Sequence, residues 1–99
     1  MSLKRTLALD AVKKVGEKIK LEGWIESIRD HGKITFVDLR DRSGVVQCVG
    51  QNLLKITSES VVEIIGKVSR RPEKLANPNL KTGEIEIQTL QAVHLRLTT

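Results

Sequence analysis

Residues 17–49 read EKIKLEGWIESIRDHGKITFVDLRDRSGVVQCV, and the spacing of apolar side chains in this stretch decides the fold class. Ile19, Leu21 and Ile25 alternate with charged or polar residues, a pattern typical of a strand with one face in a core. The alternation restarts after two polar turns, at 30–33 and 40–44. Two hairpins in succession predict a three-stranded antiparallel meander.

The rest of the chain adds two strands. Residues 60–68 are rich in β-branched side chains and predict a fourth strand. Residues 84–88 alternate cleanly and predict a fifth, which the alternation at 92–97 is able to extend. Between them, residues 69–83 form a basic loop that carries both prolines of the chain.

Helical segments are predicted at two places. Residues 8–14 favour a short helix that ends at Gly16. Residues 51–57 favour one or two helical turns between the third and fourth strands. Five short strands with this insertion predict an all-β, five-stranded OB-fold Greek-key barrel. An SH3-like barrel is the rival, but it accounts less readily for the turns at 51–57. We expect one domain over 1–99, with residues 1–6 flexible.

Composition restricts the function to a few classes. The chain has 99 residues, 17 Lys and Arg against 12 Asp and Glu, a net charge of +5 and 39% hydrophobic residues. It is too apolar for a disordered tail and too short for the deep pocket of a large two-substrate enzyme. No apolar run is long enough to span a bilayer, so we expect a soluble cytoplasmic protein without a membrane partner. The positive charge favours a binding module for a polyanion.

Cysteine and histidine counts argue against two kinds of site. Cys48 is the single cysteine, which excludes a disulfide within the chain. With only His31 and His94 beside it, a zinc site with the usual four ligands is not expected.

The second and third strands carry the first candidate site residues. An OB-fold binds its ligand across these strands and the flanking loops. Phe36 offers a ring on which a base stacks, and Gln47 offers both a donor and an acceptor to a base edge. In the alternative interpretation Phe36 belongs to the core and Gln47 merely faces solvent. With only two aromatic residues, Phe36 and Trp24, the chain is not suited to stack several bases.

The basic loop and the fifth strand carry the others. Residues 67–81 hold five Lys or Arg against Glu73 alone, which suits contacts with phosphates or bases. Glu86 alternates with Ile85 and Ile87, so it faces away from them, and its carboxylate is able to accept two hydrogen bonds from guanine. The alternatives are an ordinary solvated loop and an ordinary surface glutamate.

A resemblance sharpens these expectations. It rests on the blocks GWI at 23–25, RDHGK at 29–33, FVDLRDRSG at 36–44, VQ at 46–47, RPEK at 71–74, NP at 77–78 and TGEIE at 82–86. Together these blocks resemble the anticodon-binding domain of bacterial-type aspartyl-tRNA synthetases, which are class II aspartate–tRNA ligases. Asparaginyl and lysyl enzymes share the Gly-Trp and Phe-Asp-Leu-Arg patterns, but RDHG and TGEIE favour the aspartyl type. The resemblance covers about residues 4–97.

The resemblance implies a role for each of five residues in reading an anticodon. The middle uridine stacks at the position of Phe36, and the positions of Gln47 and Arg29 contact the same base. The position of Arg71 helps to read the third base. The position of Glu86 reads the guanine-like first base.

The chain departs from the family pattern around the third base. Leu75 stands where some relatives have a base-reading Asn, and Asn77 is near enough in sequence to replace it. His31 is typical of relatives that also accept asparagine tRNA. The position of Lys74, in contrast, is often occupied by Gly in such relatives. Because the third base separates aspartate from asparagine anticodons, the specificity of the parent enzyme stays open.

The resemblance also implies what lies outside this chain. We expect no catalytic residue, metal or cofactor here, and ATP and Mg²⁺ only in a catalytic domain that is absent. The parent is expected to be a homodimer and the isolated domain a monomer, with the tRNA anticodon loop as its partner. A generic single-strand-binding OB module is the alternative. A protein-interaction domain that docks through Trp24 is a third.

Overall fold

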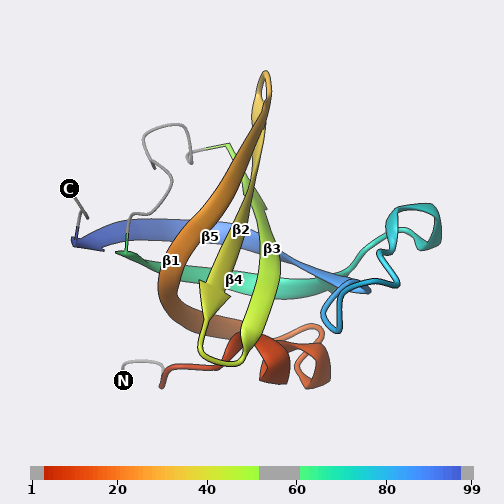
Figure 1. Cartoon of the computed structure of the whole chain (residues 1–99), viewed down its shortest axis with the longest axis horizontal. Coiled ribbons are helices and arrows are strands. Elements are labelled where there is room, and N and C mark those ends of the chain that lie inside the picture. The colour runs from red at the N-terminus through yellow and green to blue at the C-terminus, as the bar shows by residue number, and fades with distance from the viewer. Residues whose placement is uncertain (1–3, 52–60, 97–99) are drawn as a thin grey trace.

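The computed structural model describes residues 4–51 and 61–96, and within them five strands close into one barrel (Figure 1). Around the barrel the strands follow the order β1-β2-β3-β5-β4. All neighbours are antiparallel except β3 and β5, which run parallel. This is the predicted OB-fold barrel. The strands are β1 (Lys18–His31), β2 (Ile34–Asp41), β3 (Gly44–Gly50), β4 (Val61–Arg70) and β5 (Ile85–Arg96).

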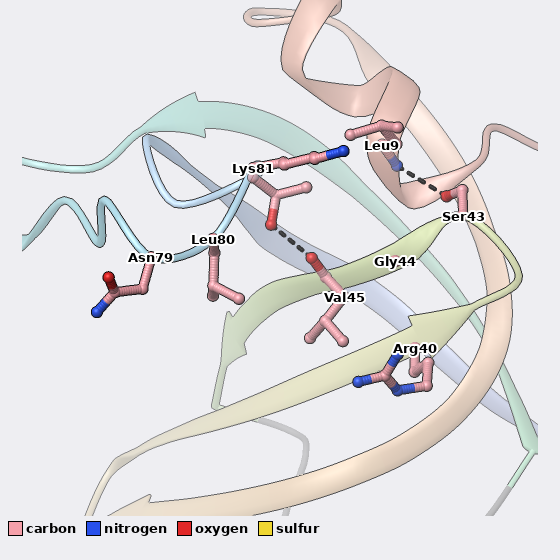
Figure 2. Close-up of a pocket in the computed structure, with 9 residues that line it drawn as sticks. Leu9, Arg40, Ser43, Gly44, Val45, Asn79, Leu80 and Lys81 are labelled. Carbon is pink, nitrogen blue, oxygen red and sulfur yellow. Dashed lines mark hydrogen bonds between the residues drawn. The ribbon is translucent and has the colours of Figure 1, made fainter.

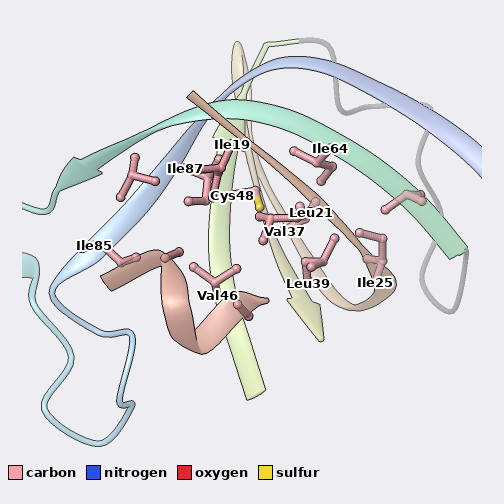
Figure 3. Close-up of a cluster of buried hydrophobic side chains, with 14 residues drawn as sticks. Ile19, Leu21, Ile25, Val37, Leu39, Val46, Cys48, Ile64, Ile85 and Ile87 are labelled. Carbon is pink, nitrogen blue, oxygen red and sulfur yellow. The ribbon is translucent and has the colours of Figure 1, made fainter. Parts of the chain in front are cut away.

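Side chains with a period of two fill the barrel (Figure 3). On β1 the core positions are those predicted, Ile19, Leu21 and Ile25, each at most 3% exposed. Cys48 is buried as a small apolar side chain, and this burial raises the pKa of its thiol. Every strand contributes an inward row, so the outward rows are left for polar residues. The inward members of the other strands are Val37, Leu39, Val46, Cys48, Val62, Ile64, Val68, Ile85 and Ile87.

Most predicted elements are present, with shifted ends. The predicted N-terminal helix is a 3₁₀ helix, η1 (Ala8–Lys13), and Gly16 after it has a φ of 90°. The segments 84–88 and 92–97 belong to one strand, β5, which reaches Arg96. The helical turns expected at 51–57 fall almost wholly outside the described residues, since only 51 is described.

The basic loop holds more regular structure than the sequence predicts, and residues 5 and 6 are hydrogen-bonded to β1. Strand β4 continues to Arg70, and a 3₁₀ turn, η2 (Glu73–Leu75), lies inside the predicted loop. Flexibility was expected for residues 1–6, but the amide of Thr6 donates to the carbonyl of Lys20 at 2.7 Å. Arg5 forms an isolated parallel β-bridge with Lys20 as well. This part of the segment is therefore anchored to β1.

The helix η1 closes one end of the barrel through the carboxylate of Asp41. Ala8 and Ala11 are fully buried, because small side chains let the helix approach the core closely. The amide of Ala8 donates to Asp41 Oδ2 at 2.7 Å. The amide and hydroxyl of Ser43 donate to Asp41 Oδ1 at 2.8 and 2.6 Å. One buried carboxylate thus joins η1 to the β2–β3 turn.

The loop between β4 and β5 is anchored beside β3 (Figure 2). The hydroxyl of Thr82 donates to the carbonyl of Val45 at 2.5 Å. The amide of Asn77 donates to the carbonyl of Gly83 at 2.9 Å. A Cβ at Gly83 would collide with the Asn77 carbonyl, so only glycine permits this approach. These contacts hold the basic loop next to the outward face of the meander.

We expect Asp41→Asn to lower the free energy of unfolding by about 1–3 kcal/mol at pH 7, the usual cost of disrupting buried charge-assisted hydrogen bonds. Burial alone would raise the pKa of Asp41, but the bonds from Ser43 and Ala8 outweigh it and hold the pKa below its ordinary value. The stabilisation is therefore complete above the unfolded-state pKa of about 4 and disappears as the pH falls through the folded pKa.

Urea denaturation at pH 7 and at pH 3 checks this expectation. The difference between wild type and Asp41→Asn should shrink at the lower pH. The exposed Asp10, changed to Asn as a control, should alter stability by no more than about 0.5 kcal/mol. An equal difference at both pH values would show that the charge of Asp41 does not matter.

Candidate nucleic-acid interface

The outward face of β1, β2 and β3 carries a cluster of polar residues around one aromatic ring. Cross-strand register places Phe36 opposite Arg29, and Asp38 between Ser27 and Gln47. A β-bulge between Ile25 and Ser27 changes the phase of β1, so that both Ser27 and Arg29 face outward. Three strands therefore bring five functional side chains onto one surface.

Arg29 is held by a two-point contact with Asp38. Its Nη1 donates to Oδ2 at 2.8 Å and its Nη2 to Oδ1 at 3.2 Å. The hydroxyl of Ser27 adds a third bond to Oδ2 at 2.5 Å. The bond to Asp38 raises the pKa of Arg29 above its ordinary value. Burial opposes ionisation of Asp38, yet the bonds from Arg29 and Ser27 outweigh it and lower the pKa of that carboxyl. The pair is thus charged and its geometry defined.

Gln47 is held at both ends of its amide. Arg29 Nη2 donates to Gln47 Oε1 at 3.0 Å, and Gln47 Nε2 donates to Glu86 Oε2 at 3.4 Å. The two contacts allow only one orientation, because a cation requires the oxygen and a carboxylate requires the nitrogen. Gln47 therefore joins the β1–β2 pair to β5. The prediction that Glu86 faces away from Ile85 and Ile87 is confirmed.

Two further residues extend the network to β4. Gln88 Nε2 donates to Glu86 Oε1 at 3.0 Å and to the hydroxyl of Ser69 at 3.3 Å. Ser69 lies opposite Glu86 in the β4–β5 register. A continuous set of hydrogen bonds consequently crosses all five strands. We call these seven residues the polar network: Ser27, Asp38, Arg29, Gln47, Glu86, Gln88 and Ser69.

Phe36 lies beside the polar network and outside the core. Its neighbours Thr35 and Val37 are fully buried on the opposite face of β2, so the alternative of a core Phe36 is wrong. Its ring is half-buried and meets the ring of His31 edge-on, with centroids 5.4 Å apart and planes at 90°. His31 therefore contacts the aromatic ring that we expect to stack on a planar ligand.

Arg71 begins the basic loop and packs back against β5. Its Nε donates to the carbonyl of Ile85 at 2.9 Å, and its Nη1 to that of Leu75 at 3.5 Å. Burial lowers the pKa of Arg71, while the charges of Glu86 and Asp38 partly oppose the change. An arginine so placed stays cationic at neutral pH. Arg71 is therefore a tethered cation close to the polar network.

The other candidates near the third-base position are not part of this network. Lys74 lies on η2 and is exposed, and Leu75 is 65% exposed. Asn77 Oδ1 accepts from the amide of Asn79 at 3.0 Å, which shapes the loop locally. Among the hydrogen bonds of the described residues, none joins Lys74 or Asn77 to Gln47 or Glu86. The structure thus brings Arg29, Phe36, His31, Gln47, Glu86 and Arg71 together, and leaves Lys74 and Asn77 on the loop.

Sequence reasoning missed four members of the polar network. It did not single out Asp38 as a site residue, although Asp38 lies within β2, two positions from Phe36. That spacing was a usable signal, because residues two apart share a face of a strand. Gln88 has the same relation to Glu86. Ser27 has the same relation to Arg29, but the bulge before it reverses the phase set by Ile19, Leu21 and Ile25, which would have pointed Ser27 inward. Ser69 is recognised only from the register of β4 with β5.

A hollow extends the same face toward the β2–β3 turn (Figure 2). Arg40 and Val45 form one side of it, and Asn79, Leu80 and Lys81 form the other. Arg40 donates to Glu26 Oε1 at 2.6 Å. The hollow continues the outward face beyond Gln47, and its lining cations are Arg40, which is paired with Glu26, and Lys81.

Two other kinds of feature are absent from the part of the chain that the structure describes. No group of three or more metal-ligating side chains occurs within residues 4–51 and 61–96. In the same ranges no helix is long and apolar enough to cross a membrane.

Curated relatives with similar sequences are aspartate–tRNA ligases. The chain is 48% identical over 82 residues to an aspartate–tRNA(Asp/Asn) ligase of Syntrophomonas wolfei. This match covers 74% of this chain and 14% of that protein. It is 48% identical over 85 residues to an aspartate–tRNA ligase of Bacillus licheniformis, and this match covers 77% of this chain and 14% of that protein. The chain thus spans about 14% of the length of the relatives it matches.

Solved structures and a family model agree with the barrel described above. An aspartyl-tRNA synthetase from Entamoeba histolytica superposes with a TM-score of 0.84 at 18% identity, over 97% of this chain and 22% of that one. Asparaginyl-tRNA synthetase from Pyrococcus horikoshii superposes with a TM-score of 0.76 at 21% identity, over 99% of this chain and 24% of that one. At these identities the likeness establishes the fold alone. The model of the OB-fold nucleic acid binding domain matches residues 19–93. The chain belongs to this family of OB-fold nucleic acid binding domains.

Proposed function

We propose that this domain reads the anticodon loop of a tRNA as one part of an aspartate–tRNA ligase. The observation that carries the proposal is the polar network beside Phe36, on the face that OB-folds use for single-stranded nucleic acid. One stacking ring, one oriented amide and one carboxylate lie within a few side chains of each other. That set suits a few bases read individually, and the names of the relatives support the same function.

The middle base is assigned to Phe36 and Gln47. A uridine stacked on Phe36 would place its edge near Gln47 and Arg29, which the network already holds in position. Stacking is tolerant of base identity, whereas the oriented amide distinguishes donors from acceptors. The ring therefore supplies affinity and the amide supplies selectivity.

The first and third bases are assigned to either side of this centre. Glu86 is a carboxylate acceptor and suits the N1–H and N2–H donors of guanine.

Arg71 supplies donors toward the third base, with the exposed Lys74 of the same loop nearby in sequence. Asn77, whose side-chain oxygen is engaged with Asn79, is a weaker replacement for the base-reading Asn missing at Leu75. His31, edge-on against Phe36, is close enough to the platform to influence specificity between aspartate and asparagine tRNAs.

The remaining parts of the proposal concern the parent enzyme. Aminoacylation, with its ATP and Mg²⁺, is assigned to a catalytic domain outside these 99 residues, and this domain acts by binding alone. We assign the isolated domain as a monomer, the parent as a homodimer and the location as the cytoplasm.

Titration with short RNA hairpins tests the function directly. Three ligands suffice: two anticodon stem-loops that differ only by C or U at the third anticodon position, and one with a scrambled loop. We expect both stem-loops to bind more tightly than the scramble. A preference for C over U indicates an aspartate-specific parent, and equal binding one that also charges asparagine tRNA. If all three bind equally, a generic single-strand module is the better interpretation; if none binds, a protein-interaction domain is.

Phe36→Ala is expected to weaken binding of the anticodon stem-loop by about 1–3 kcal/mol, the value of one base–aromatic stack. Folding should persist, because the ring lies outside the core. Trp24→Ala is the matched control, since Trp24 is the other aromatic side chain and is 41% exposed at a different part of β1. A fluorescence titration measures both. Equal losses of binding free energy for the two variants would show that Phe36 does not stack on a base.

Arg71→Gln is expected to reduce the preference at the third anticodon position with little change in salt dependence, because its guanidinium is tethered to two backbone carbonyls. Arg70→Gln removes the same charge from an exposed neighbour and serves as the control. Titrations at several salt concentrations separate the two roles. A uniform loss for all ligands, with the slope of log K against log salt reduced by about 0.7, would instead identify a phosphate contact.

A further inference from the structure

Gln88 connects two strands through an exposed side chain. Gln88 and Glu86 are two residues apart on β5 and therefore share its outward face. The amide nitrogen of Gln88 donates to Glu86 Oε1 at 3.0 Å and to the hydroxyl of Ser69 on β4 at 3.3 Å. Ser69 in turn donates to the backbone carbonyl of Glu86 at 3.5 Å. Glu86 is thereby bonded on its side chain and on its backbone.

The carboxylate of Glu86 receives one donor on each oxygen. Gln88 serves Oε1 at 3.0 Å, and Gln47 serves Oε2 at 3.4 Å. An ionised carboxylate has about four acceptor positions, so about one remains on each oxygen. Two parallel acceptors match a base edge that presents two adjacent N–H donors, as guanine does and adenine does not.

The rotamer alone does not define the plane of this carboxylate. The terminal torsion of a glutamate is broad and roughly two-fold. Arg71 is close enough for its charge to interact with Glu86, and would attract an unrestrained carboxylate. Neutral donors on both sides oppose such a rotation without cancelling the negative charge.

We propose that Gln88 is a positioning residue that sets base specificity at Glu86. It holds the carboxylate plane so that both oxygens face the base together. The inference rests on the proposed function, because it concerns the same anticodon-reading face. It assigns the selectivity for a guanine-like first base to a pair of residues on β5, of which only Glu86 touches the base.

The test compares two anticodon stem-loops that differ only by G or A at the first anticodon position. Gln88→Met removes the amide while keeping a similar length and charge. We expect the preference for G over A to fall about fivefold, the scale of one hydrogen bond. The preference for the middle uridine over cytidine should stay the same, and so should the melting temperature. Gln91→Met is the matched control, on the same strand and exposed, opposite Ile65.

A second pair of variants changes charge as well. Gln88→Glu replaces the donor with a carboxylate that repels Glu86, and should reduce the G preference at least as much as Gln88→Met. Gln91→Glu adds the same charge elsewhere on β5 and should leave the preference intact.

Three results would overturn the inference, each in a recognisable way. If the wild-type domain prefers G and Gln88→Met keeps the same preference, Gln88 has no positioning role, and the proposed function is unaffected. An equal loss of affinity for every ligand, with a lowered melting temperature, identifies a merely structural role. A wild-type domain that binds stem-loops and scramble alike rejects the proposed function and this inference together.

Discussion

The bidentate contact between Arg29 and Asp38 is the interaction on which the outward face depends. Without Asp38 the guanidinium would be a mobile surface cation, and with it the Nη2 edge is directed at Gln47. The orientation of Gln47 then decides which of its atoms meets Glu86. A single charge pair thus determines the direction of donors and acceptors across three strands, at an exposed site where the pair itself adds little stability.

The barrel makes this arrangement possible because a strand presents its side chains with a period of two. The same alternation that buries Val37 and Leu39 places Asp38 outward between them. Barrel closure then brings β5 next to β3, in parallel, although thirty-four residues separate Gly50 from Ile85. Core and site are therefore two consequences of one pattern. A one-residue slip in β2 would bury Asp38 and expose Val37 at once.

Local patterns predicted much of the fold and part of the site. Strand positions, the core row of β1, the N-terminal helix and the outward direction of Glu86 all follow from alternation and turn residues. The extra length of β4, which reaches Arg70, did not, because hydrogen bonds between strands, not local preference, decide where pairing stops. Ser69 was missed for a related reason, because it acquires its role from a neighbour on another strand. The bulge in β1 hid Ser27, since one inserted residue reverses the phase that a sequence pattern assumes.

Charge on this domain is arranged in two ways that serve different ends. The chain carries +5 overall, which attracts a polyanion of any sequence, yet the centre of the outward face holds two carboxylates, Asp38 and Glu86. Acids at that position oppose phosphate binding, so their presence argues against a surface built for the backbone alone. Base edges, unlike phosphates, carry N–H donors that a carboxylate accepts. Cations around the edge therefore favour encounter with RNA, and the amides, the acids and Arg29 at the centre give the surface a means of telling one base from another.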